Sequence, residues 1–334
     1  PIIGYRNLSI NTLRLFKSEV LSRDFGPLTQ NSRNSYGSYE DALKYKYYAE
    51  EISQVLYPND SNYAGRLLRL KQEYFFVSAG IQDIIRKYKK KKLDIKKLYE
   101  KVAIHINDTH PTLCIPELMR ILLDEEGLNW DEAWNITINT ISYTNHTIMT
   151  EAMERWPKDM LKQLIPRIYM IIEEINRRYI NDLQHKNYDN DKIYKMSIID
   201  NNDVKMANLS IVGSHSVNGV AKLHSELLKK EVLNDFYEYE PYKFNNKTNG
   251  IAHRRWLISA NTELSDFITE LISEDWKKDT NKLKDLESYI NNKDVLEKIG
   301  NIKYNNKKRL AKFIKEKYNI EVNPDSIFDI QIKR

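Results

Sequence analysis

The sequence has one cysteine, few glycines and prolines, and no long apolar run. The single thiol, Cys114, cannot close an intramolecular disulfide, and the amino-terminal segment lacks the basic, apolar and small-residue pattern of a signal peptide. The longest apolar stretch covers residues 168–172, which is far below the roughly 18 residues of a membrane helix. We therefore expect a cytoplasmic protein that does not span a membrane.

The composition excludes further classes of protein. Ten glycines and nine prolines among 334 residues are too few for collagen or a low-complexity chain, and 41% apolar residues are too many for wholesale disorder. The sequence contains no Walker loop, G-x-S-x-G string or G-x-G-x-x-G string. Its length predicts about two domains. The pattern alone thus predicts a globular fold but no reaction.

Positive charge is concentrated in one segment. The net charge is +5, and residues 86–97 contain eight basic residues and one acidic residue. Such a run can bind phosphate, nucleic acid or an acidic partner, or it can be the solvated end of a helix. Tyr88 is its only aromatic residue, whereas RNA- and DNA-binding modules interleave several, so we expect no nucleic-acid partner.

Hydrophobic periodicity predicts an α/β protein. Two units of strand, loop and helix are predicted, the first at 102–106 and 112–126 and the second at 209–212 and 217–230. Other segments with helical spacing are 41–55, 67–88, 130–142 and 160–179. Alternation of this kind is typical of a parallel sheet covered by helices.

A domain boundary is predicted at Asn249-Gly250, a dipeptide that favours turns. Beyond it the chain is helical over 267–276 and 295–318, and a β-prone run at 327–332 predicts a last strand with no partner after it. Because the sequence also begins with Pro1 instead of methionine, we expect a fragment of a longer protein.

Two polar loops are candidates for a ligand site, because ligands of parallel sheets bind beyond the carboxyl ends of the strands. One loop contains Asp108 and His110, and the other contains His215. The loops converge on one pocket if their strands are neighbours. Alternatively, Asp108 caps the next helix and His110 is a packed loop residue. His105, Asp108 and His110 are all side chains that can bind a metal. Successive residues of a strand point to opposite faces, however, and no second carboxylate cluster completes a site, so no metal is expected.

Several long strings give the sequence a family resemblance. Among them are LRLKQEYF at 68–75, NDTHP at 107–111, IPELMR at 115–120, YTNHT at 143–147 and GSHSVNG at 213–219. In this order they closely resemble the α-glucan phosphorylase family, which includes the glycogen and starch phosphorylases. Further matches extend from GYRN at 4–7 to NPDSIFDIQIKR at 323–334, so the resemblance covers essentially the whole chain.

The resemblance implies a retaining glycosyltransferase of the GT-B fold, a homodimer that uses pyridoxal phosphate and inorganic phosphate to release glucose 1-phosphate from α-1,4-glucan. It implies that residues 1–249 belong to the carboxyl-terminal part of the family's first domain and residues 250–334 to the start of its cofactor-binding domain. The family's Schiff-base lysine lies outside these residues, so we expect the chain alone to be inactive. The alternative is a short, non-catalytic paralogue that acts as a glucan-binding or interaction module.

The same resemblance assigns catalytic roles. His215 in GSHSVNG is similar to the histidine that contacts the glucosyl unit, and Asn249 in KTNG is similar to a residue that binds a sugar hydroxyl. Asp108 and His110 match the loop that lines the active-site cleft. Arg334 matches an arginine that binds substrate phosphate through charge-assisted hydrogen bonds.

Other residues match sites around the catalytic centre. Trp256 and Lys333 resemble residues that lie near the cofactor. The remaining assignments are a mobile gate loop at Asn59 and Asp60 and an allosteric phosphate site at Arg86 and Lys87. Lys87 stands where animal members have an arginine, and a lysine is a poorer bidentate partner for phosphate.

Overall fold

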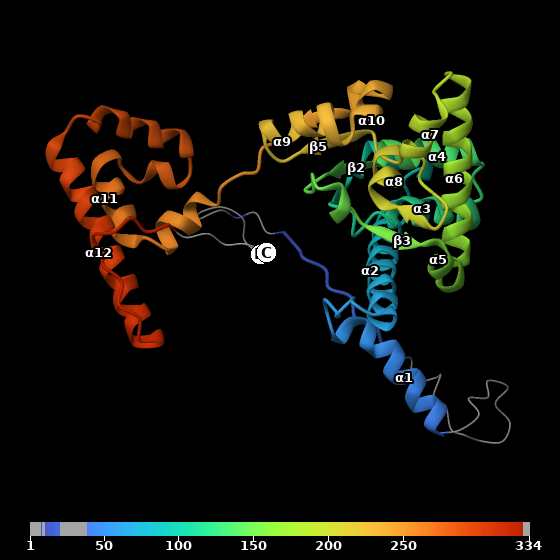
Figure 1. Ribbon diagram of the computed structural model, residues 1–334, viewed down its shortest axis with the longest axis horizontal. Coiled ribbons are helices and arrows are strands. Elements are labelled where there is room, and N and C mark those ends of the chain that lie inside the picture. Colours follow the sequence, from blue (N-terminus) through green and yellow to red (C-terminus); the bar gives the residue numbers. More distant parts are fainter. Residues whose placement is uncertain (1–7, 9–10, 21–38, 330–334) are drawn as a thin grey trace. The chain divides into compact units, whose positions relative to one another are not determined.

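The chain forms two compact units in the computed structural model, which describes residue 8, residues 11–20 and residues 39–329 (Figure 1). The larger unit is Leu15–Asn249, and the other contains the residues from Gly250 onward. Each unit is considered by itself. The assignment of residues 1–249 and 250–334 to the two domains of the family stays a prediction.

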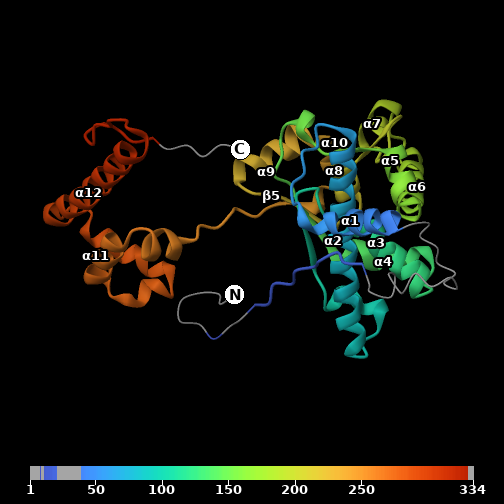
Figure 2. The same cartoon turned by 90° about the horizontal axis from the view of Figure 1, so that it is seen from below.

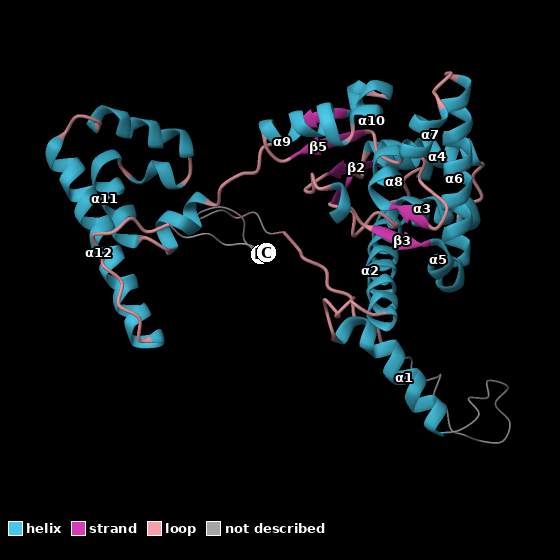
Figure 3. Cartoon of the chain, in the orientation of Figure 1, coloured by secondary structure: helices cyan, strands magenta, loops and turns pink. Residues whose placement is uncertain are grey.

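A four-stranded parallel sheet lies at the centre of the larger unit (Figure 3). Its strands are, in spatial order, β1 (Ile104–Asn107), β2 (Ile141–Thr144), β5 (Ser216–Gly219) and β6 (Phe244–Asn246). Ile106, Tyr143 and Val217 lie side by side across three strands and are almost fully buried. Parallel strands are stable only when helices cover them, and the α/β class predicted from the sequence is confirmed.

A smaller antiparallel sheet lies beside it. It pairs β3 (Arg155–Pro157) with β4 (Asp203–Lys205), and Trp156 stands opposite Val204 in its buried centre. The chain then enters α8 (Met206–Val212) without a break.

Three early predictions agree with the structure to within a few residues. Helices were expected at 41–55 and 67–88, and the structure has α1 (Tyr39–Gln54) and α2 (Tyr63–Lys90). The helix expected at 112–126 is α3 (Cys114–Arg120) continued by a π-helical turn, η3 (Ile121–Glu125). In α2 and α3 the apolar residues recur every three to four positions, so the period that predicts each helix also places its buried face against the core.

The remaining helices of this unit cover the sheet and its edges. They are α4 (Trp130–Thr140), α5 (Lys158–Leu164), α6 (Pro166–His185), α7 (Asn190–Met196), α9 (Lys222–Leu227) and α10 (Asn234–Tyr239), with shorter turns at η2 (Ile95–Glu100), η4 (Thr150–Ala152), η5 (Leu228–Val232) and η6 (Pro241–Lys243). α2 and α3 lie side by side in two perpendicular views (Figures 1 and 2). Most of the large buried side chains lie between these helices and the sheet.

The second predicted strand is wrong. Residues 209–212 belong to α8, and the strand β5 begins only at Ser216. Every residue of α8 is buried, so the helix has no solvated face, and its sequence shows no helical period. A short apolar run does not distinguish a buried helix from a buried strand. The observed order here is helix, loop, strand and helix.

Two predicted helices differ from the structure, one in its end and one by a break. The helix expected at 130–142 ends at Thr140 and passes directly into β2, a strand that the sequence did not predict. The helix expected at 160–179 is divided between α5 and α6, because Pro166 disfavours a helical conformation at Ile165 and cannot donate an amide hydrogen bond. The three-residue strand β6 was also missed.

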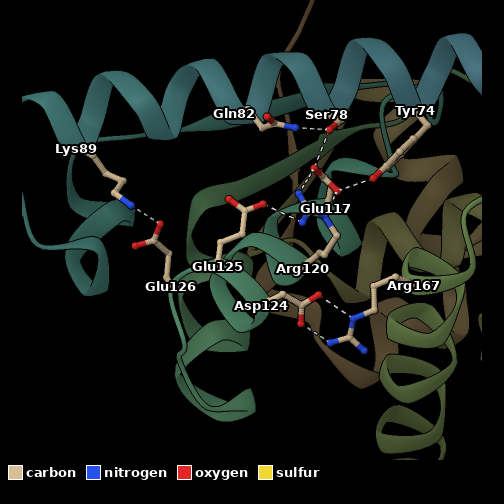
Figure 4. Close-up of polar contacts among 10 residues, drawn as sticks. All are labelled: Tyr74, Ser78, Gln82, Lys89, Glu117, Arg120, Asp124, Glu125, Glu126 and Arg167. Carbon is tan, nitrogen blue, oxygen red and sulfur yellow. Dashed lines mark hydrogen bonds and ion pairs between the residues drawn. The ribbon is translucent and has the colours of Figure 1, made fainter. Parts of the chain in front are cut away.

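A buried ion pair fixes α3 against α2 (Figure 4). The Glu117 side chain is 0% exposed, and its carboxylate accepts two hydrogen bonds of 2.9 Å from Arg120, one turn further along α3. On the other side it accepts hydrogen bonds from Tyr74 Oη (3.0 Å) and Ser78 Oγ (2.8 Å), both on α2. Arg120 also pairs with the half-exposed Glu125 at 2.8 Å.

The described elements of the smaller unit are helices. It contains η7 (Arg255–Ser259), α11 (Thr262–Ile272), η8 (Glu274–Lys277), η9 (Thr280–Tyr289) and α12 (Lys293–Tyr318). Phe267, Val295 and Ile302 form its core. Residues 327–329 are not in a strand, and the rest of the strand predicted at 327–332 lies outside the described residues. None of the helices in the described ranges is long and apolar enough to cross a membrane.

Candidate active site

Four loops meet at the carboxyl edge of the parallel sheet, and backbone hydrogen bonds join each one to its neighbour. Asp108, after β1, donates its amide to the Thr144 carbonyl, and Asn145, after β2, donates to Asn218 in β5 (both 2.9 Å). After β6, the amide of Asn249 donates to the Val220 carbonyl at 3.0 Å. These bonds bring the ends of all four strands into one polar surface.

His146 is an exposed imidazole of this surface. It follows β2 in the YTNHT string, and its Nε2 lies 2.5 Å from Asn107 Oδ1 at the end of β1. The preceding residue, Asn145, is 1% exposed, bonds to Tyr143 Oη at 3.0 Å and accepts the Thr147 amide at 2.9 Å. The exposed amide of Asn107 and the buried amide of Asn145 thus hold His146 outward over the sheet edge.

The loop after β1 is held in an uncommon backbone conformation. Asp108 has φ +60°, in the left-handed region that aspartate tolerates better than most side chains, and its carboxylate accepts the Thr109 amide at 2.9 Å. His110 is exposed and lines, with Asp108, a cavity of 240 Å³. The structure brings these two predicted residues together at the carboxyl edge, as the ligand-site hypothesis requires.

Carboxylates gather around one arginine at this cavity. Arg69 of α2 pairs with Asp60 at 2.6 Å, with Glu73 at 3.2 Å and with Glu154 at 3.4 Å. Glu154 also accepts a hydrogen bond of 2.8 Å from the Thr109 hydroxyl. One guanidinium therefore ties the predicted gate loop to the loop that follows β1. The sequence offered LRLKQEYF as a family string but no sign of this convergence.

Burial, reinforced by the nearby carboxylate of Glu154, raises the pKa of Glu73 to about 9. The folded state therefore binds a proton that the unfolded state releases between pH 4.5 and about 9. Stability falls as pH rises through that window, because the folded protein binds more protons than the unfolded chain.

We expect Glu73→Gln to remove much of this pH-dependent loss, since glutamine is neutral at every pH. Urea midpoints of the 334-residue chain between pH 5 and 9 measure it. Glu174→Gln is the control, because two arginines lower the pKa of Glu174 to about 2 and its contribution is lost only in acid. Parallel curves for Glu73→Gln and the parent protein would contradict the expectation.

His215 lies at the opposite edge of the sheet, so the predicted convergence of the two loops is wrong. Its amide donates to the Ile141 carbonyl at 3.0 Å and its Nδ1 lies 3.1 Å from the Ile138 carbonyl, where α4 ends and β2 begins. The reason is the misassigned strand, because a loop before β5 lies at the amino edge and not at the carboxyl edge. Its role as a glucosyl contact stays a prediction.

The predicted gate residues lie just before α2. Asn59 Oδ1 accepts the Ser61 amide at 3.0 Å, and Asp60 is held by Arg69. Gly65 is required here, because a Cβ at this position would lie 1.7 Å from the Asn59 carbonyl oxygen. The turn is thus held by a close backbone approach at one end and by an ion pair at the other.

The predicted phosphate residues Arg86 and Lys87 both pair with Asp83, at 2.6 and 2.8 Å. Arg86 lines a cavity of 760 Å³ beside α2, and Lys87 is not among the residues that line it. The two cations therefore share one carboxylate.

The predicted cofactor contact Trp256 belongs to the smaller unit and is 62% exposed. Lys333 and Arg334 lie outside the described residues. Within the described ranges, no group of three or more histidine, cysteine, aspartate or glutamate side chains is arranged to hold a metal.

Sequence reasoning missed His146 and the part-buried network of Arg69, Glu73 and Glu154. A usable signal for His146 was present, because Ile141 to Thr144 is β-branched and aromatic and runs directly into the YTNHT string. For the network there was none, because its members are separated by up to 85 residues in the chain.

Fold and site together define an α/β protein whose ligand surface lies beyond the carboxyl ends of a parallel sheet. Within that class, a family model described as carbohydrate phosphorylase matches residues 1–334, and the chain belongs to this family. The family resemblance and the GT-B class predicted from the sequence are thereby confirmed.

Glycogen phosphorylases are among its relatives. The chain is 48% identical over 336 residues to glycogen phosphorylase of Bacillus subtilis and 46% identical over 346 residues to the muscle form of Homo sapiens. It is 45% identical over 346 residues to the muscle form of Oryctolagus cuniculus. These alignments cover 100% of this chain, which spans about 40% of the length of the curated relatives.

Proposed function

We propose that this chain supplies part of the active site of an α-glucan phosphorylase, which transfers a glucosyl unit from α-1,4-glucan to inorganic phosphate and releases glucose 1-phosphate. The observation that carries the proposal is the joined row of loops at the carboxyl edge, in a chain that matches the family along its whole length. Imidazole, carboxylate and amide groups gather there, and these are the groups that hydrogen-bond sugar hydroxyls.

Within this site we assign the sugar contacts to His146 and Asn249, with Asp108 and His110 on the adjoining wall. All four stand on loops that the backbone bonds place at one edge, whereas His215 is at the other. Asp60 closes the cavity on the gate side through its bond to Arg69. These residues bind and orient substrate, and Arg334 is the proposed partner of substrate phosphate.

Pyridoxal phosphate is the proposed cofactor, and when bound it supplies a phosphate group that holds or relays a proton. Among the described residues, Trp256 fits a planar ring, because its indole is 62% exposed and free to stack. Lys333 is the other proposed contact. Cofactor chemistry of this kind needs no pair of catalytic carboxylates in the protein.

We also infer a cytoplasmic homodimer in the complete protein. α1 has an apolar and aromatic surface, with exposed side chains of Leu43, Tyr45, Tyr47 and Tyr48. Exposed large apolar and aromatic side chains of this kind favour a protein interface. A second copy of the protein is the partner that the family resemblance implies.

A chimaera tests the proposed function. Residues 1–334 replace the aligned segment of the Bacillus subtilis relative, and glucose 1-phosphate is measured from glycogen and inorganic phosphate. We expect the chimaera to be active and the isolated chain to be inactive, because the family resemblance implies that the lysine that binds the cofactor is not among residues 1–334. Turnover by the isolated chain, or a folded but inactive chimaera, would overturn the proposal. Glycogen binding by the chain together with an inactive chimaera would favour the non-catalytic module.

A further inference from the structure

Two side chains at the first turns of α9 reach back to the loops of the carboxyl edge. His224 Nδ1 accepts a hydrogen bond of 3.0 Å from the Val220 amide, in the loop between β5 and α9. Ser225 Oγ lies 3.0 Å from the Ala221 carbonyl and 3.0 Å from Asn246 Oδ1 at the end of β6. Adjacent residues of one helix thus hold the ends of two neighbouring strands.

The approach of α9 is possible only because residue 219 is a glycine. A Cβ on Gly219 would lie 2.5 Å from Ser225 Oγ and 2.9 Å from His224 Nδ1. Side chains of α9 occupy the space that a side chain at position 219 would need. The spacing of Gly219, His224 and Ser225 in the sequence is therefore set by this contact.

The bond from Val220 defines the protonation state of His224. An imidazole nitrogen that accepts an N–H must carry a lone pair, so the ring hydrogen is on Nε2. That nitrogen is buried and has no hydrogen-bond partner among the described residues. Burial, with a smaller contribution from His146, lowers the pKa of His224, which keeps the acceptor available at neutral pH.

We propose that His224 is a positioning residue for the site, which places Asn249 by holding the backbone of Val220. The Val220 amide is bound by His224, and its carbonyl accepts the amide of Asn249 at 3.0 Å. The N–H and C=O groups of Val220 thus link α9 to the loop after β6. This inference rests on the proposed function, in which Asn249 binds a sugar hydroxyl.

Two substitutions in the chimaera separate positioning from packing. In His224→Asn the amide oxygen stands close to the place of Nδ1 and still accepts from Val220, so we expect kcat/KM within about threefold of the parent. His224→Leu fills similar space without an acceptor, and we expect a loss of at least about tenfold, since the part-buried Val220 amide is left without its hydrogen-bond acceptor. Equal activity of the two variants, whether retained or lost, would overturn the proposal.

A double variant tests whether His224 acts through Asn249. If it does, His224→Leu causes little further loss in a protein that already carries Asn249→Ala, because residues that act as one unit are not additive. Independent, multiplying losses would contradict the inference. Thermal unfolding of each variant shows whether a loss of activity follows from a loss of folded protein.

The tautomer can be measured without any activity. Nitrogen NMR of the imidazoles in the 334-residue chain should show His224 with hydrogen on Nε2 at neutral pH. Hydrogen on Nδ1 would overturn the inference and leave the proposed function intact. An inactive parent chimaera would overturn the proposed function. The role of His224 in catalysis would then fall too, even if the NMR spectrum still shows its hydrogen bond to Val220.

Discussion

Replacing His146 by alanine in the chimaera is expected to lower kcat/KM for phosphorolysis by roughly 10²–10³-fold, the usual cost of removing one preorganised polar group from an active site. His146 has an exposed imidazole over the carboxyl edge, and it is held there by Asn107 and by the buried amide of Asn145. Initial rates of glucose 1-phosphate formation over a range of glycogen concentrations measure the effect.

His215→Ala is the matched control for that substitution. It removes the same kind of side chain, also exposed, from the opposite edge of the sheet. We expect a change of no more than about threefold, as for most surface substitutions. The reverse result, with His215→Ala inactive and His146→Ala active, would support His215 as the glucosyl contact that the family resemblance implies. It would refute the assignment of that contact to His146.

The largest expected effect on stability is at Glu117. Glu117→Ala should lower the free energy of unfolding by roughly 2–4 kcal/mol, because Arg120 keeps only its half-exposed partner Glu125, and Tyr74 and Ser78 lose their buried acceptor. Urea unfolding of the chain, followed by circular dichroism, measures the difference.

Glu125→Ala provides the comparison, since Glu125 pairs with the same guanidinium from the half-exposed side. Its side chain is 50% exposed, against 0% for Glu117. An exposed ion pair contributes about 0–1 kcal/mol, so a small effect is expected. Similar losses for the two variants would show that the position of Arg120, and not the burial of its partner, determines stability.

Predictability from the sequence differed between the two halves of the site. The loop with Asp108 and His110 was identified, because β1 is short, β-branched and followed by polar turn residues. The loop with His146 was missed, because α4 runs into β2 without a turn residue between them. The amphipathic pattern of the helix therefore concealed the start of the strand.

A single error of secondary structure moved His215 across the sheet. Once α8 is assigned as a strand, the following loop belongs to the carboxyl edge, whereas the true strand begins after that loop. The fold class survived this error, because it depends only on alternation. The site did not, because it depends on which end of a strand a loop follows.

Insertions and deletions should be tolerated very unequally around this surface. The end of β5 accepts backbone bonds from both sides, with Asn218 receiving the Asn145 amide and Val220 receiving the Asn249 amide. One added residue in the segment 219–221 would displace both neighbouring loops together. Between Thr147 and β3 the backbone makes none of these bonds between the loops, so changes in the length of that segment should leave the carboxyl edge in place. Insertions and deletions among natural members of the family should therefore be rare at the end of β5.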